Sequence, residues 1–169
     1  PIDVIVSEES HYTIFGALRL LGLGSERLRR VPTDSQGRMR ADALAATLRS
    51  GTGPCLVCAQ AGNVNTGAYD PIAEIAEATR GRGAWLQVDG AFGLWAASSA
   101  RHRHLLDGID RADSIAADAH KWLNVPYDCG VVFTAHPDAH RRSMTVSSAY
   151  ILETDAERDP RDYSPEESR

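Results

Sequence analysis

The 169-residue sequence predicts an α/β domain with a mostly parallel β-sheet and one antiparallel strand. Short runs rich in Val, Ile and Leu alternate with segments of helical periodicity, which is the order expected of βαβ units. Glycines and prolines separate these segments, as they do at the ends of helices and strands. The last two strand-like runs are joined by only eleven residues, Asp118 to Asp128, and a parallel crossover usually needs a dozen or more. We therefore expect that pair to be antiparallel.

The first half of the chain contains three predicted strands and two predicted helices. Residues 2–6 form a strand, residues 27–31 a short strand closed by Pro32, and residues 55–59 a buried strand. A helix over residues 41–48 ends at Ser50 and Gly51. An earlier helix ends at Gly22, and its apolar face follows the i, i+3, i+4, i+7 spacing in His11, Ile14, Phe15, Leu18 and Leu21.

The second half continues the alternation. Asp70 is predicted to be the N-cap of a helix that has Pro71 in its first position and Ile72, Ile75 and Ala76 on its apolar face. Further strands are expected over residues 84–88, 114–117 and 130–133.

Composition indicates a globular protein and excludes several classes. The chain is 43% hydrophobic and 24% charged, and its net charge of −5 does not favour nucleic-acid binding. No membrane span or signal peptide is recognisable. Cys55 and Cys58 form a C-x-x-C inside a predicted strand, so we interpret them as core residues in a reducing, cytoplasmic environment. Because the chain starts at Pro1 within a strand and stops in a polar stretch, we interpret it as a fragment of a longer protein.

Ligands of open α/β sheets bind beyond the carboxyl ends of the strands. This rule directs attention to residues 7–11, 62–70, 89–93 and 118–122. Asp89 ends a strand and is followed by Ala91; it is either a turn residue or the anionic partner of a pyridinium nitrogen, with Ala91 flat against the ring. Lys121 is either a surface charge or, with Trp122 beside it, an amine in a partly apolar pocket suited to Schiff-base chemistry.

Four blocks in this order resemble the group II pyridoxal phosphate (PLP)-dependent amino-acid decarboxylases, which include the aromatic-amino-acid and glutamate decarboxylases. The blocks, with a fifth matching stretch after them, are SEESH at 7–11, AGNVNTGAYDPI at 61–72, VDGAFG at 88–93, DAHKW at 118–122 and VPYDC at 125–129. The resemblance implies the large domain of the aspartate aminotransferase-like fold (fold type I).

The resemblance also implies a role for each matching residue. Lys121 would hold PLP as a Schiff base, and His120 would contact its phosphate. Asp89 would pair with the ring nitrogen, Ala91 would pack on one ring face, and His11 would stack on the other. Asn63 and Val64 would approach the cofactor where the relatives often carry threonines, with contacts through the backbone alone.

Several positions depart from the family pattern. Asp118 stands where animal enzymes often have an asparagine that contacts phosphate, so we expect its side chain to face elsewhere or to bond neighbouring amides. Gln87 replaces a common histidine. Residues 1–150 would be part of the PLP-binding large domain, and residues 151–169 the start of a mobile loop. Tyr150 and Tyr163 are candidates for the proton donor of that loop.

These features predict PLP-dependent decarboxylation of an L-amino acid to the amine and CO₂, in a homodimer with a small-molecule substrate and no metal, membrane or nucleic-acid partner. Two alternatives stay open. One is another PLP reaction on the same scaffold, namely aldehyde synthesis, carbon–carbon cleavage or desulfuration. The other is a truncated, non-catalytic binding or assembly module. The identity of the amino acid is not predicted.

Overall fold

The computed structural model describes residues 1–144 and divides the chain into two compact units, Pro1–Ala135 and His136–Arg169. The first unit contains the β-sheet and the candidate site. In the second unit the described residues form helix α5 (Pro137–Met144). The mobile-loop prediction for residues 151–169 and its candidates Tyr150 and Tyr163 lie outside the described residues.

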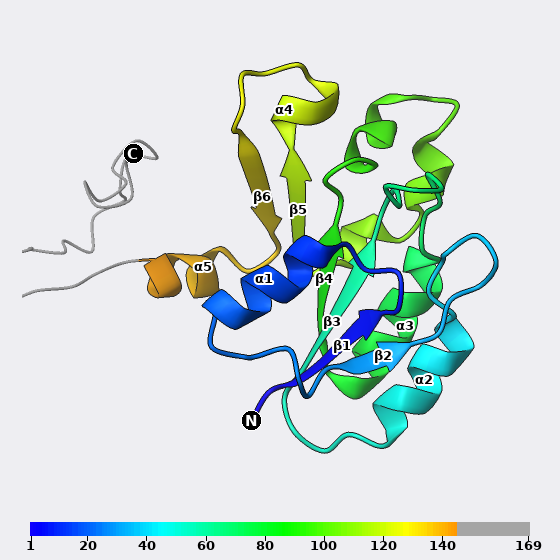
Figure 1. Cartoon of the computed structure of the whole chain (residues 1–169), viewed down its shortest axis with the longest axis vertical. Coiled ribbons are helices and arrows are strands. Elements are labelled where there is room, and N and C mark those ends of the chain that lie inside the picture. Colours follow the sequence, from blue (N-terminus) through cyan, green and yellow to red (C-terminus); the bar gives the residue numbers. More distant parts are fainter. Residues whose placement is uncertain (145–169) are drawn as a thin grey trace, which may run out of the picture. The chain divides into compact units, whose positions relative to one another are not determined.

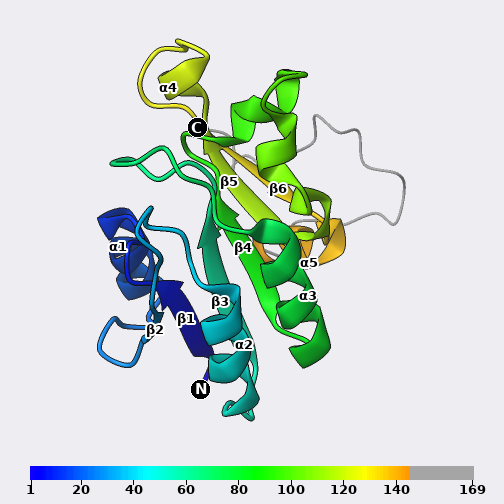
Figure 2. The same ribbon diagram turned by 90° about the vertical axis from the view of Figure 1, so that its right-hand side faces the viewer.

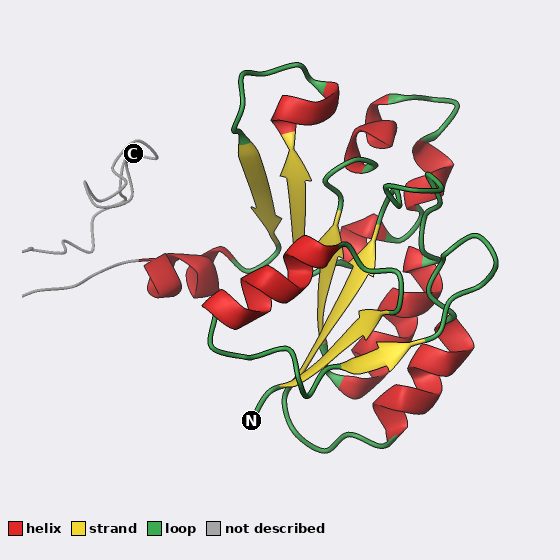
Figure 3. Ribbon diagram, in the orientation of Figure 1, coloured by secondary structure: helices red, strands yellow, loops and turns green. Residues whose placement is uncertain are grey.

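The first unit is built on a six-stranded sheet in the order β2-β1-β3-β4-β5-β6, in which β5 and β6 are antiparallel and all other pairs are parallel. Figures 1 and 3 show the strands side by side. The predicted α/β class and the antiparallel last pair are therefore confirmed. The strands are β1 (Asp3–Ser7), β2 (Arg29–Val31), β3 (Cys55–Gln60), β4 (Trp85–Asp89), β5 (Ser114–Asp118) and β6 (Gly130–Thr134).

Helices cover both faces of this sheet, as Figure 2 shows. Alternate side chains of a strand point to opposite faces, so Ile5 joins one core while Val4 and Val6 join another. The larger core lies under α2 (Ala41–Arg49), α3 (Ile72–Arg82) and the 3₁₀ turns Leu94–Ser98, Arg103–Leu106 and Ile109–Arg111. The smaller core lies under α1 (Tyr12–Leu20), which contributes Leu18.

Cys55 and Cys58 are buried in β3, as the sequence predicts. Burial raises the pKa of the Cys58 thiol to about 12, so this thiol stays protonated and inert. Neither residue forms a disulfide.

The predicted N-cap of α3 is wrong. Pro71 occupies the cap position without a side-chain hydrogen bond, and the helix starts at Ile72. Asp70 instead turns toward the sheet, where Oδ1 accepts the amide of Met39 at 2.7 Å and Oδ2 accepts the amide of Gln60 at 2.8 Å. Two amides from other parts of the chain, that of Met39 buried and that of Gln60 partly buried, thus satisfy the carboxylate in place of the helix terminus.

Candidate active site

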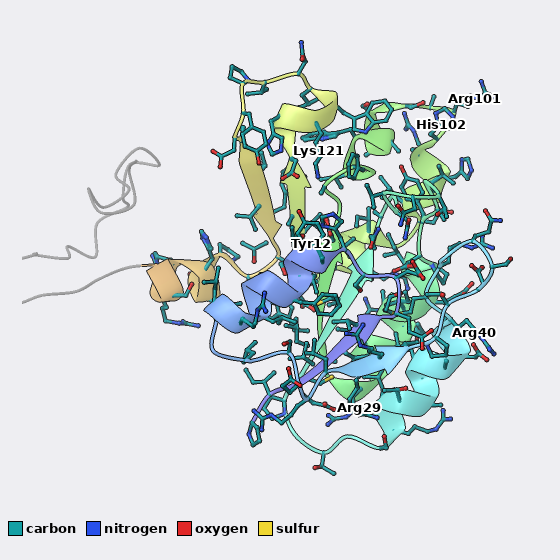
Figure 4. The ribbon with its side chains drawn as sticks, viewed as in Figure 1. Tyr12, Arg29, Arg40, Arg101, His102 and Lys121 are labelled. Carbon is teal, nitrogen blue, oxygen red and sulfur yellow. The ribbon has the colours of Figure 1, made fainter. Side chains whose placement is uncertain are left out.

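The expected site residues follow four strands that are neighbours in the sheet. His11 comes after β1, Asn63 after β3 and Asp89 ends β4, while Lys121 follows β5 in the short helix α4 (Ala119–Trp122). Because these strands are parallel, their carboxyl ends share one edge of the sheet. Figure 4 shows Lys121 beyond this edge, with Tyr12 at the start of α1 on the same side. The structure therefore gathers these four segments along one edge.

Lys121 is held between a carboxylate and an aromatic ring. Its Nζ lies 2.7 Å from Asp118 Oδ2 and 4.0 Å from the centroid of the Phe92 ring. Asp118 ends β5, and its backbone oxygen accepts a hydrogen bond of 3.1 Å from Trp95 Nε1. Asp118 thus faces the lysine, and no neighbouring amide bonds its side chain within the described part of the chain.

The ring of His120 is oriented by the backbone of Cys129. The amide of Cys129 donates to Nδ1 at 3.0 Å. The oxygen of Cys129 lies 3.2 Å from the same Nδ1 and also accepts the amide of Ala119 at 2.9 Å. The amide of Cys129 can only donate, and this decides the role of Nδ1. We therefore assign Nδ1 as the acceptor, which leaves the hydrogen of the neutral ring on Nε2. Nε2 lies 3.7 Å from Asp118 Oδ2, beyond hydrogen-bond distance.

Asp89 is half-buried at the end of β4, where it is paired in register with Gln60 and Ala116. Its Oδ1 accepts the amide of Ala91 at 3.1 Å, which fixes the carboxylate against the following turn. Oδ2 accepts no hydrogen bond from residues 1–144. The carboxylate therefore retains an oxygen that can receive a donor from a ligand.

His11 is the residue before α1 and forms its N-cap position without a side-chain cap bond. Its Nδ1 shares a hydrogen bond of 2.8 Å with Thr13 Oγ1, and its ring contacts that of Tyr12 at 4.4 Å between centroids. Nε2 is therefore the ring nitrogen left for a ligand.

The loop after β3 approaches the turn after β4 through glycine. A Cβ on Gly93 would lie 2.5 Å from the oxygen of Ala61, so only glycine fits there without a shift. Asn63 is buried and its Oδ1 accepts the amides of Asn65 and Thr66 at 2.8 and 3.2 Å.

Val64, next to Asn63, is 49% exposed. Because Asn63 Oδ1 accepts two amides of its own loop, it stabilises that loop. A contact of Asn63 or Val64 with the cofactor stays a prediction.

Phe92 and Trp95 are contacts that the sequence did not single out. Phe92 precedes the 3₁₀ turn Leu94–Ser98 and Trp95 lies within it, where no sequence periodicity reveals a side chain's partners. They also line a pocket of about 510 Å³ beside α4, together with Tyr69, Leu105, Trp122 and Leu123. The pocket is lined mainly by aromatic and apolar side chains and adjoins the lysine through Phe92.

Comparison with known proteins identifies the family. Residues 2–167 match the model of the pyridoxal-dependent decarboxylase conserved domain. The chain belongs to this family. As a member of the decarboxylase family it is similar to an acidic amino acid decarboxylase of Bos taurus, with 35% identity over 90% of this chain and 30% of the relative.

Two solved structures of the family resemble this chain. The apo form of mouse CSAD has 34% identity and a TM-score of 0.80 over 91% of this chain and 34% of its own. A TDC of Oryza sativa with PLP and tryptamine has 30% identity and a TM-score of 0.80 over 90% of this chain and 32% of its own. The chain therefore spans about a third of each of these relatives.

The donor set of this decarboxylase-family domain fits PLP, the cofactor of the family. Lys121 is the only lysine of the sequence, so it is the one amine here that could hold an aldehyde. Asp89 offers a free carboxylate oxygen to a protonated ring nitrogen, and His120 offers Nε2–H to a phosphate. Residues 1–144 gather no group of three metal-ligating side chains. No helix formed by those residues is long and apolar enough to cross a membrane.

Proposed function

We propose that the protein to which this domain belongs decarboxylates an L-amino acid to the amine and CO₂, with PLP held on Lys121. The observation that carries the proposal is the order of residues along the sheet edge. His11, Asp89 and Lys121 lie at the carboxyl ends of the parallel strands β1, β4 and β5, with β3 between β1 and β4, in a chain that belongs to the decarboxylase family. This order supports one site formed by all three residues.

The bound cofactor would supply an electron sink for the electron pair that CO₂ leaves behind. Asp89 would keep the ring nitrogen protonated, because its Oδ2 has no donor among the described residues and its Oδ1 is anchored by Ala91. Ala91 has a side chain small enough to lie against a flat ring. Asp89 would set the electrostatics of the sink, Ala91 would leave room for the ring, and Lys121 would set its position.

The two histidines would contact opposite parts of the ligand. His120 would donate Nε2–H to the phosphate, since Cys129 occupies its Nδ1. His11 would use Nε2 to orient the substrate carboxylate or to move a proton at Cα, since Thr13 occupies its Nδ1. Asn63 and Val64 would meet the cofactor through the backbone of their loop.

Borohydride reduction of the full-length protein in the presence of PLP, followed by peptide mapping, tests the central assignment. We expect a pyridoxyl adduct on Lys121. An adduct on a different lysine, or none, would overturn the proposal. Release of CO₂, aldehyde and sulfide from a panel of amino acids then separates decarboxylation from the other PLP reactions.

The assembly and the compartment belong to the same proposal. The exposed apolar side chains around α4 and β6 support a homodimer: Trp122, Leu123, Tyr127, Val132 and Phe133. The three free thiols are consistent with the cytoplasm. Sedimentation of the full-length protein would test the dimer; a monomer at micromolar concentration would contradict it.

A further inference from the structure

We propose that Asp118 holds the amine of Lys121 whenever this lysine is not bonded to the cofactor, and thereby limits its reactivity. The inference rests on the proposed function, because it concerns the lysine that would carry PLP. It assigns a positioning role to a residue at which this sequence departs from the family pattern.

The ion pair is short and more sheltered than most surface pairs. Asp118 Oδ2 lies 2.7 Å from Lys121 Nζ, and each side chain is only 26% exposed. The pair between Arg40 and Asp42 is as short, at 2.6 Å, but its side chains are 52% and 70% exposed. The Phe92 ring adds a second contact to the ammonium at 4.0 Å, where a ring face attracts a cation.

Asp118 is held in place by the sheet. It is the last residue of β5 and pairs with Gly130 of β6, while Trp95 donates to its backbone oxygen. The carboxylate therefore starts from a fixed backbone position. Lys121 has a long side chain and lies three residues further on, in α4. When the two side chains separate, the lysine is the partner that can move.

Two donors face the same carboxylate. Besides Lys121 Nζ, the Nε2 of His120 lies 3.7 Å from Asp118 Oδ2. These are the charged or titratable groups that approach Asp118 within the described part of the chain. Asp118 therefore stands between the amine that would bind the cofactor carbon and the imidazole that would bind its phosphate.

Attachment of the cofactor requires this ion pair to open. Two N–H bonds of the ammonium would have to break: their electron pairs would form the C=N bond from Nζ to the aldehyde carbon, and the two protons would leave with the aldehyde oxygen as water. While Asp118 binds the ammonium, these electron pairs stay in the N–H bonds. The same carboxylate is available to receive Lys121 again when a substrate amine takes its place during turnover.

The test is the reactivity of Lys121 in the apo form of the full-length protein. Trinitrobenzenesulfonate reacts with neutral amines, and mass spectrometry of the Lys121 peptide gives the rate at this site. We expect Asp118→Asn to be labelled about two- to five-fold faster than the wild type at neutral pH, as removal of a partly exposed ion pair implies. Attachment of PLP, followed by absorbance, should also be faster in Asp118→Asn than in the wild type.

Two controls separate this effect from unfolding and from a general change in charge. Asp128→Asn removes an exposed carboxylate from the same connection and should leave the rate unchanged. The thiols of Cys55 and Cys58 are buried and should stay unreactive in every folded variant. If the thiols become reactive in Asp118→Asn, that variant is replaced by Asp118→Ser, whose thiols must also stay unreactive.

The inference would be overturned if Lys121 were labelled at the same rate in the folded Asp118 variant, in the wild type and in Asp128→Asn. The proposed function fails differently: wild-type protein would then form no borohydride-stable adduct on Lys121, whatever the labelling rates. The two results are therefore distinguishable.

Discussion

The backbone amide of Cys129 donates to Nδ1 of His120 at 3.0 Å, and this bond joins α4 to the residue before β6. It selects the tautomer in which Nε2 carries the hydrogen. A ring held this way already presents Nε2–H, so little rotational freedom would be lost if it bound a phosphate.

The role of His120 can be tested with two forms of the cofactor. His120→Ala should weaken binding of PLP by roughly 10- to 100-fold, because a hydrogen bond to a charged group contributes about 1.5–3 kcal/mol. Binding of pyridoxal, which lacks the phosphate, should change little. Equilibrium titration of the apoprotein followed by absorbance measures both. An equal loss with both forms would indicate that His120 supports the fold of the site and does not bind phosphate.

Asp89→Asn should separate cofactor attachment from turnover. The amide cannot keep the ring nitrogen protonated, so we expect turnover to fall by about 100-fold or more. The adduct on Lys121 should still form, since the amine is untouched. Steady-state kinetics and peptide mapping after reduction give the two readouts, with Asp128→Asn as the exposed control. Full turnover in Asp89→Asn would contradict the assigned role.

Asp70 predicts a pH dependence of stability. Burial outweighs its two amide donors and raises the pKa of this carboxyl to about 6, from an ordinary value of 3.8. Because the fold favours the protonated form, its contribution to stability is complete below about pH 4 and is lost as pH rises through about 6.

Denaturant unfolding across this range compares the wild type with Asp70→Asn, which does not titrate. The free energy of unfolding of the wild type should fall relative to the variant by up to about 1.4 kcal/mol per pH unit between pH 4 and 6. If the free energies of unfolding of the two proteins changed in parallel with pH, Asp70 would have an ordinary pKa in the fold.

Gly93→Ala should destabilise the domain. The new Cβ would lie 2.5 Å from the oxygen of Ala61, so backbone segments would have to move apart, at a cost of about 1–3 kcal/mol. Gly81→Ala is the matched control, because its Cβ meets nothing within 4 Å in α3 and alanine favours a helix by about 1 kcal/mol. The midpoint of thermal unfolding should fall for Gly93→Ala and rise for Gly81→Ala. Equal shifts of the two midpoints would rule out the clash.

Much of the fold and the position of the site could be predicted from the sequence. Hydrophobic periodicity located the strands and helices, and the short connection after Asp118 indicated the antiparallel pair. Residues placed just after strands, such as Asp89 and Lys121, were expected at one edge, because parallel strands all end there. These predictions depend on neighbours in sequence and on rules common to α/β sheets.

Only the tertiary structure decided which partners the polar side chains have. Asp70 lies next to a helix start, yet it binds the amide of Met39, a residue 31 positions away. The indole of Trp95 reaches the backbone of Asp118 across 23 positions. Such contacts depend on which strands and turns become neighbours, and local sequence does not encode that choice. The sequence by itself determined where Lys121 would lie; the packing of β5, α4 and the turn after β4 determined that Asp118 and Phe92 hold it there.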